Sequence, residues 1–291
     1  MKVFDANLPF FKGNMHMHTT ISDGAWTPEQ AKAAYAAAGY DFIAITDHRV
    51  VGATGKYENM LVMSGAEYDY LFADQVLHIV AVLPDDRMRE AKIPYDDHEA
   101  LLRMIGQYGG AAILAHPAWS LNTTALMRSL PEICGAEVYN TFSGIPWNTP
   151  RADSGHVLDL LATSGRLTPF VAGDDSHHYQ GEQCQSWTMV QARECTPQAI
   201  LEALRAGRFY ASQGPKFEDV EVLEDRMIVK TSPVDTAVFV SNMPWVEGRC
   251  RTGKDMTVQE YRFQRDSGET FVRCEIMDAQ GRRAWLSPLA L

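Results

Sequence analysis

The stretch FIAITDH, residues 42–48, decides the fold, because it is a short apolar run that ends in polar side chains. The same arrangement recurs in LVMSGAE (61–67), AAILAHP (111–117) and PFVAGDD (169–175). Short apolar runs bounded in this way predict buried strands. LHIVAVL (77–83) and GAEVYN (135–140) predict two further strands.

Helical patterns separate several of these strands. Thr27, Pro28 and Gln30 form an N-terminal capping signature for a helix that Gly39 closes. Further helices are predicted at residues 97–108 and 153–164. Alternation of buried strands with helices indicates a mostly parallel sheet, hence an α/β layer fold or barrel. His48, Glu67, His116 and Asp175 would then follow strand C-terminal ends, where α/β barrels collect active-site side chains.

The pattern changes near residue 215. The remaining sequence alternates apolar and polar residues at period two, as in VEVLEDRMIVK and TFVRCEIMD, with turn signals at DSG and AQG. We therefore expect a barrel-like domain at 1–215 and a small all-β, sandwich-like domain at 216–291.

Composition narrows the classes of function. The chain has 291 residues and a formal net charge of -11, which disfavours binding to a nucleic acid polymer or an anionic membrane. No apolar run approaches the length of about 20 residues that crosses a bilayer. The first residues lack a secretion pattern, so we expect cytoplasmic localisation. The 5 cysteines show no CxxC spacing, which argues against a disulfide framework and against thiolate zinc.

Imidazoles and carboxylates recur together in HMHTTISDG (16–24), TDH (46–48), the stretch from Gly65 to His78, AHP (115–117) and GDDSHH (173–178). His16 and His18 are two apart on an expected strand and would project from the same face. Glu67 lies between two strongly apolar runs, where an unpaired buried carboxylate would be costly, so a cation is expected nearby. Convergence of such donors is what a cluster of divalent ions requires.

Each of these residues also has a structural interpretation. His48, His78 and His116 could be hydrogen-bonded core histidines, and Asp23 could simply bond its own turn. In GDDSHH, Asp175 and His177 are favoured as ligands over Asp174 with Ser176, because serine is a poor ligand for most first-row ions. Asp47, Asp174 and His178 are then candidates for supporting positions around the ligands.

The ordered motifs HxHT…SDG, TDH, GxE with a histidine eleven residues later, AHP and GxDxH resemble the PHP (polymerase and histidinol phosphatase) superfamily of metal-dependent phosphoesterases. The resemblance covers about the first 215 residues, and the tail is similar to a branch with a C-terminal β domain. It implies a distorted (β/α)7 barrel that holds up to three divalent ions. The implied ligands are His16, His18, Asp23, His48, Glu67, His78, His116, Asp175 and His177. Asp174, the first aspartate of GDDSHH, departs from many relatives, which have serine before the metal-binding aspartate, and an inserted domain between His78 and His116 is absent.

These observations predict a hydrolase with two or three Mn, Fe or Zn ions that cleaves a small phosphate ester through attack of a metal-bridging hydroxide on phosphorus. Glu67 is expected to bridge ions and Asp175 to position the nucleophile. Arg49 and Lys56 are candidate phosphate clamps, although both could be solvated loop charges. Two alternatives stay open: a metallohydrolase of a carbamate, ester or amide, and a non-catalytic binding module. The sequence leaves the natural substrate and the oligomeric state open.

Overall fold

The computed structural model describes residues 1–72, 74–131 and 133–291. The first part of the chain alternates strands and helices. Its elements are β1 (Phe10–Asn14), α1 (Pro28–Ala37), β2 (Phe42–Ala44), β3 (Gly55–Tyr57), β4 (Met60–Phe72), β5 (Gln75–Leu83), α2 (His98–Gln107), β6 (Ala111–Leu114), α3 (Thr124–Ser129), β7 (Gly135–Asn140), α4 (Gly155–Thr163), β8 (Phe170–Gly173), β9 (Trp187–Gln191), α5 (Pro197–Arg205) and β10 (Phe209–Ser212). Short 3-10 turns occupy Arg87–Glu90, Phe142–Gly144 and Arg265–Ser267.

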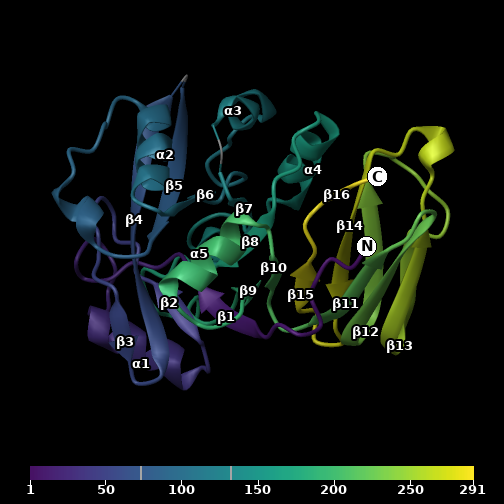
Figure 1. Cartoon of the computed structure of the whole chain (residues 1–291), viewed down its shortest axis with the longest axis horizontal. Helices are drawn as coiled ribbons and strands as arrows, with labels where there is room; N and C mark the ends of the chain where they lie inside the picture. The colour runs from purple at the N-terminus through teal and green to yellow at the C-terminus, as the bar shows by residue number, and fades with distance from the viewer. Residues whose placement is uncertain (73, 132) are drawn as a thin grey trace.

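The rest of the chain forms strands. They are β11 (Phe217–Val222), β12 (Arg226–Ser241), β13 (Cys250–Arg262), β14 (Phe271–Met277), β15 (Arg283–Trp285) and β16 (Leu289–Ala290). In Figure 1 these strands, coloured green to yellow, lie beside α4 and β10. The prediction that an all-β segment follows residue 215 agrees with this element order.

Helix α1 begins as its sequence predicts. The Thr27 hydroxyl accepts a hydrogen bond from the Gln30 backbone, and the Gln30 side chain accepts one from the Thr27 backbone. Gly39, with φ +72°, ends the helix in the left-handed conformation that glycine adopts without strain. The predicted helices at 97–108 and 153–164 correspond to α2 and α4.

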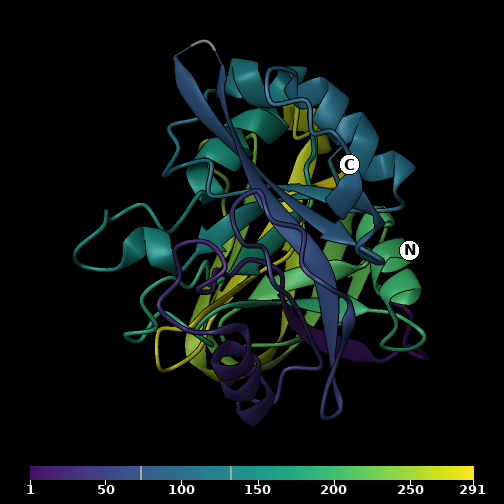
Figure 2. The ribbon, with the colours of Figure 1, turned by 90° about the vertical axis from the view of Figure 1, so that its left-hand side faces the viewer.

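The sheet of the first part is not parallel throughout. β1, β2 and β4 pair in parallel, as do β6, β7 and β8, but β5 runs antiparallel to both β4 and β6. Figure 2 shows the long β4–β5 pair crossing the front of the molecule. Because β5 is reversed, His78 near its start lies opposite Asp69 and close to the C-terminal ends of the neighbouring strands.

The expected closed barrel is not confirmed by the backbone ladders. In the described part of the chain, β8 ends the hydrogen-bonded strand order and forms no ladder with β1. The two strand ends meet through isolated bonds instead: Asp175 N donates to His16 O at 2.8 Å, and His18 N donates to Ser176 O at 3.0 Å. The α/β class stands, and the segments that follow β1 and β8 are joined by these bonds beside the predicted site.

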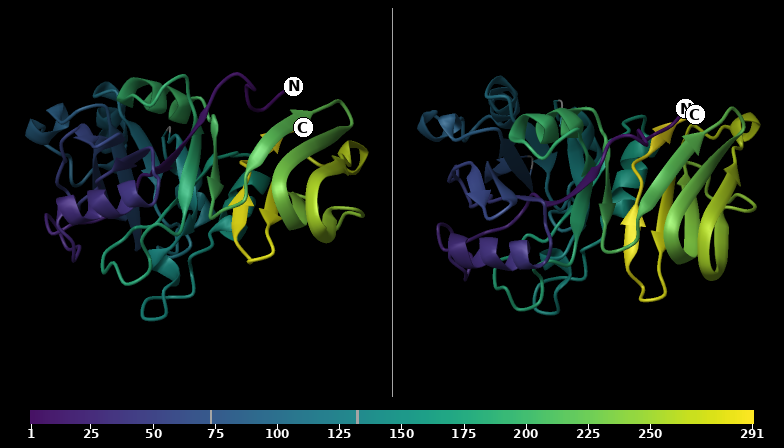
Figure 3. Two further views of the ribbon diagram at one scale, coloured as in Figure 1. Left: turned by 90° about the horizontal axis from the view of Figure 1, so that it is seen from below. Right: turned by 60° about the horizontal axis from the view of Figure 1, so that its bottom comes forward.

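The sheet continues into the C-terminal strands. β10 pairs with β9 on one side and with β15 on the other, so hydrogen bonds cross the predicted boundary at residue 215. The N-terminal residues join the same region, where Val3 N donates to Val220 O at 2.9 Å. Figure 3 shows both termini beside these strands. The boundary itself stays a prediction.

Two further observations concern the chain as a whole. Within the described ranges, no helix combines the length and the apolar character needed to cross a membrane. The five cysteines are all free thiols, in agreement with the absence of a disulfide framework in the sequence.

Candidate metal centre

The structure brings all the predicted ligands together at one end of the sheet. His16 and His18 follow β1, His48 follows β2, and Glu67 lies in β4. His48 and Glu67 form an isolated parallel bridge, and so do Met17 and Ser176. Short-range pairing just beyond the strand ends therefore holds four separate chain segments side by side.

The nine side chains form three overlapping groups, in each of which the donor atoms lie within 4.8 Å of one another. The groups are His18, Asp23, His48 and His177; His16, His18, Glu67 and Asp175; and Glu67, His78 and His116. His18 belongs to the first two groups and Glu67 to the last two. An arrangement with shared members suits neighbouring ions better than a single one.

Glu67 and Asp175 occupy the centre. Glu67 Oε2 lies 3.3 Å from His16 Nε2, 3.1 Å from His18 Nε2 and 3.3 Å from His48 Nδ1. Asp175 Oδ1 lies 3.1 Å from the Nε2 atoms of both His16 and His18. Glu67 Oε1, on the other side of the carboxylate, lies 3.4 Å from His116 Nε2.

Several of these atoms are buried without a hydrogen bond. Among the described residues, they include His16 Nε2, His18 Nε2, Glu67 Oε1 and Asp175 Oδ1. Buried polar atoms almost always have partners, and leaving one unsatisfied costs about 1–3 kcal/mol. All four point into the groups described above, so divalent cations would satisfy them together.

The charges in the site perturb one another. Burial lowers the pKa of His18, but the nearby carboxylates of Asp175 and Glu67 outweigh it and raise that pKa to about 9. Burial favours the neutral acid of Glu67, yet His16 and His116 hold its pKa well below the usual value. His78, by contrast, has its pKa lowered to about 4 by burial and by His116. In the metal-free chain, the His18 ring therefore carries a proton near neutral pH, and a bound ion would replace that proton.

Two predicted ligands have unusual backbone conformations. His116 has φ +27° and Asp175 has φ +54°, both in the region that non-glycine residues seldom adopt. Such conformations cost of order 1–3 kcal/mol and concentrate at functional sites. They occur here directly after β6 and β8, where the chain turns to direct a donor toward Glu67.

Glu137 of β7 is a part of the site that the motifs did not reveal. Its Oε1 lies 2.8 Å from His16 Nδ1, and its Oε2 accepts hydrogen bonds from His116 N at 2.9 Å and from Asn140 Nδ2 at 2.7 Å. A carboxylate on the far nitrogen fixes the tautomer of a metal-binding imidazole. The sequence feature that could have pointed to Glu137 is a carboxylate inside the apolar run GAEVYN.

The expected supporting residues have different roles from one another. Asp47 accepts hydrogen bonds from Thr19 and Ser22, so it holds the turn before Asp23 rather than an imidazole. Asp174 accepts hydrogen bonds from the Tyr35 hydroxyl and from the backbone amides of Cys184 and Gln185, and it fixes that loop. The His178 ring lies near Phe142, with the ring centroids 5.6 Å apart.

Neither candidate phosphate clamp lines the site cavity. Arg49 is paired with Asp69 at 2.6 Å. Lys56 is in β3 opposite Leu61, six residues before Glu67 on β4 and hence roughly 20 Å away along the strand. The interpretation of both as exposed structural charges fits their positions better.

A cavity of about 360 Å³ opens over the three groups. Its described lining consists of donor residues and aromatic side chains: Asp23, His48, Glu67, His78, His116, Trp119, Phe142, Asp175, His177 and His178. This described lining includes no lysine or arginine. The cavity therefore combines a floor of imidazole and carboxylate groups with an aromatic wall.

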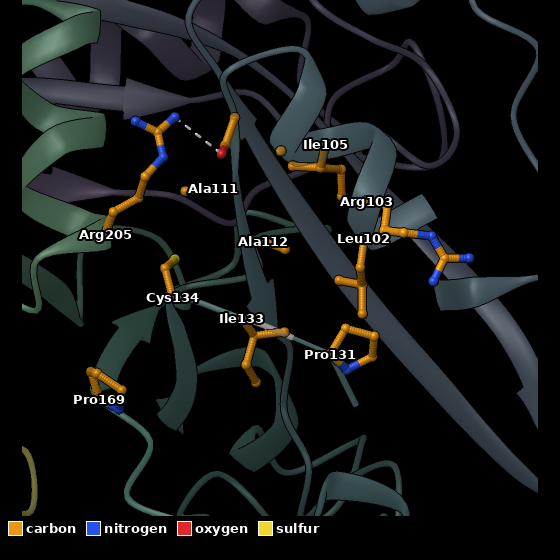
Figure 4. A pocket seen from close by; sticks show the side chains of 12 residues that line it. Leu102, Arg103, Ile105, Ala111, Ala112, Pro131, Ile133, Cys134, Pro169 and Arg205 are labelled. Carbon is orange, nitrogen blue, oxygen red and sulfur yellow. Dashed lines mark hydrogen bonds between the residues drawn. The ribbon is translucent and has the colours of Figure 1, made fainter. Parts of the chain in front are cut away.

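A second cavity, of about 410 Å³, lies toward the opposite end of β6 (Figure 4). It is bordered by Ala111, Ala112 and Cys134, and Arg205 donates a hydrogen bond to Gly110 O at 3.2 Å. Burial raises the pKa of the Cys134 thiol to about 12, so this thiol stays protonated near neutral pH. No imidazole or carboxylate is among its described lining residues, and the predicted chemistry has no counterpart there.

Comparison with known proteins supports the fold. A two-domain protein from Bacteroides vulgatus ATCC 8482, which contains a predicted PHP-like metal-dependent phosphoesterase, matches with a TM-score of 0.53 and 19% identity. The match covers 99% of this chain and 96% of that one. A candidate metal-dependent phosphoesterase from Bifidobacterium adolescentis ATCC 15703 matches 57% of this chain and 87% of its own, with a TM-score of 0.40 and 14% identity.

One sequence relative is the DNA polymerase/3'-5' exonuclease PolX of Bacillus subtilis strain 168, which is 34% identical over 89 residues. That region is 30% of this chain and only 16% of PolX, so this chain spans a small part of that protein. No protein-family model matches the sequence. The whole-chain structural match nevertheless confirms, at the level of the fold, the resemblance to a two-domain PHP-like metal-dependent phosphoesterase.

Proposed function

We propose that this chain is a metal-dependent hydrolase that cleaves a small phosphate ester. The observation that carries the proposal is the convergence of nine imidazole and carboxylate side chains in three overlapping groups at the floor of one cavity. Imidazole and carboxylate donors without thiolates suit Mn, Fe or Zn. Two or three such ions fit the three groups.

The residues divide into distinct tasks. Glu67 faces His18 with Oε2 and His116 with Oε1, so it would be shared by ions in two groups, and Asp175 would join His16 and His18 in holding one of them. When bound, divalent ions would polarise the ester and supply a water with a lowered pKa. Glu137 holds the His16 ring and the His116 backbone, which fixes two ligands before substrate arrives.

His178 is the imidazole in the described cavity lining that lies outside the three groups, and its residue is exposed. A side chain in that position can donate a proton to the leaving oxygen as the ester bond breaks. Phe142 and Trp119 line the same cavity and would limit access of bulk water to it.

A second candidate substrate is a neutral carbonyl compound, a carbamate, ester or amide. The absence of lysine and arginine from the described cavity lining favours it, because the cavity offers a phosphate no positive side chain besides its ion sites. The non-catalytic alternative is less well supported, since every one of the nine expected donors is present and converges.

The test is reconstitution of the purified chain with Mn, Fe or Zn, followed by assays against phosphate monoesters, phosphate diesters, carboxylic esters and carbamates. We expect phosphoester turnover that is lost in Glu67→Gln. Turnover of carbonyl substrates alone would replace the phosphoesterase proposal by the second one. Inactivity of all three metal forms toward the whole panel would favour a binding module.

A further inference from the structure

Part of the aromatic wall of the cavity, Phe142, belongs to residues 141–152, the segment between β7 and α4, called here the wall segment. Within it, the Phe142 ring stacks on the ring of the expected ligand His177, with centroids 4.3 Å apart and an interplanar angle of 22°. Asn148 Oδ1 accepts a hydrogen bond from Trp119 Nε1 at 2.9 Å. Displacement of this segment would therefore disturb the aromatic wall against which the His177 ring is stacked, while the His177 ring keeps its own hydrogen bond with Asp175 O at 2.8 Å.

Two backbone hydrogen bonds hold the two ends of the wall segment side by side. Asn140 N donates to Ala152 O at 2.9 Å, and Ser154 N donates to Val138 O at 2.8 Å. Asp153 lies between the two residues that form these bonds, Ala152 and Ser154, and its Oδ1 accepts a hydrogen bond from Gly155 N at 2.7 Å. Asp153 Oδ2 is thereby directed away from the helix start.

The charged partner of Asp153 Oδ2 comes from the C-terminal strands. Arg283 Nη1 of β15 lies 2.6 Å from Asp153 Oδ2 and 3.0 Å from Glu275 Oε1 of β14. Its guanidinium also lies over the Trp285 ring, 4.9 Å from the centroid. Tyr139 of β7 stacks on Trp285 with centroids 5.4 Å apart.

A second pair of the same kind holds α4. Arg273 of β14 bonds both oxygens of Asp159, at 2.6 and 2.8 Å, and its side chain is only 4% exposed. Bidentate pairing of this type fixes direction as well as distance. The two arginines are joined through Glu275, which lies 3.3 Å from Arg273 Nη1.

We propose that Arg283 and Arg273 are positioning residues through which the C-terminal strands hold α4 and the adjoining wall segment, which borders the cavity, in place. Neither arginine lines the cavity, so both act through Asp153 and Asp159. The expected effect on KM rests on the proposed function, whereas the expected effect on the stability of the wall segment does not.

The first test measures hydrogen–deuterium exchange of the full chain. Arg283→Met should accelerate exchange in peptides that cover the wall segment by about tenfold, the factor that corresponds to a loss of about 1.4 kcal/mol. Asp153→Asn should do the same, and the double variant should be no faster than either single one. Arg226→Met is the matched control, because Arg226 is 31% exposed against 28% for Arg283 and also pairs with two carboxylates, but within the C-terminal strands.

Unchanged exchange in the wall segment of Arg283→Met, or equal acceleration in Arg226→Met, would overturn the proposal. If Arg283→Met does not fold, Asp153→Asn decides, because it keeps an oxygen for Gly155 N and removes only the charge. Exchange needs no substrate, so its result stands even if the wild-type chain hydrolyses nothing in the panel.

The second test is kinetic, on whichever substrate the wild-type chain turns over. Arg283→Met should raise KM about tenfold while kcat and the metal content change little, since the wall segment is distorted and the ligands remain. Arg283→Lys should recover part of the loss. A fall in kcat and metal content at constant KM would show that the pair only maintains the fold, and would contradict a positioning role.

Discussion

Glu137 shows how much of the site depends on a residue that does not itself face the cavity. Its two oxygens contact the His16 ring, the His116 backbone and the Asn140 side chain. The motifs indicated the donors, because His48, Glu67, His116 and Asp175 each follow an apolar run and the other donors lie in short motifs rich in histidine and aspartate or beside such a run. They could not locate Glu137, because a carboxylate within a strand has no local partner that would show its role.

We predict that Glu137→Gln weakens metal binding by about 10–100-fold, the range seen when the partner of a ligating imidazole is lost. The amide can no longer hold His16 with a full negative charge. Isothermal titration with Zn²⁺ measures the effect. Glu269→Gln is the matched control, since Glu269 is also buried and bonds Tyr261 Oη far from the site; equal weakening in both variants would contradict the role of Glu137.

The protonation of His18 predicts how metal affinity depends on pH. Its pKa of about 9 in the metal-free chain is above the usual 6.5, so the ring is protonated at pH 7. An ion must displace that proton, and affinity should therefore rise with pH up to about 9 and then level off. Titrations at pH 7 in buffers of different ionisation enthalpy should show release of at least one proton per chain; no release would refute this charge state.

For His178 we predict a dependence on the leaving group. His178→Asn should slow hydrolysis of esters with poor leaving groups by about 100-fold or more, as loss of a general acid does, and leave esters with good leaving groups almost unaffected. Metal content should not change, because His178 lies outside the three groups. A uniform loss across leaving groups would assign His178 to binding instead.

At the scale of elements, signals that are local in the sequence predicted where helices and strands occur, but they did not predict the direction in which each strand runs. The start of α1 follows from Thr27, Pro28 and Gln30, which are adjacent in sequence. The reversal of β5 does not follow from LHIVAVL, because an apolar run has no direction. Closure beside the site depends on pairing between the ends of β1 and β8, which are far apart in sequence, and it is limited to isolated bonds.

The turn between β1 and α1 offers a test at this scale. A Cβ on Gly24 would lie 2.4 Å from His18 O and 2.6 Å from Thr19 N, so the turn that carries Asp23 would have to move. We predict that Gly24→Ala loses about one bound ion per chain, from the group of His18, Asp23, His48 and His177, by elemental analysis. Gly55→Ala, whose Cβ would meet nothing within 4 Å, is the control. Full metal content in Gly24→Ala would contradict the importance of this turn.

At the scale of the whole molecule, the C-terminal strands extend the sheet of the first part through β10 and β15. The period-two pattern predicted these strands, because alternation is a local property. It could not predict the pairs of Arg273 and Arg283 with Asp159 and Asp153, since charges on separate elements leave no periodic trace. The all-β segment is therefore joined to α4 and to Asp153 beside the wall segment by ion pairs that are visible only in the folded structure.

The central claim is that nine side chains from separate segments hold divalent ions at one end of the sheet. Anomalous diffraction from crystals of the Mn-reconstituted chain, collected at the Mn absorption edge, tests it most directly. We predict two or three peaks, each within one of the three groups and one of them beside Glu67. Crystals with full Mn occupancy elsewhere, or with no anomalous peak among His16, Glu67 and His177, would contradict the account.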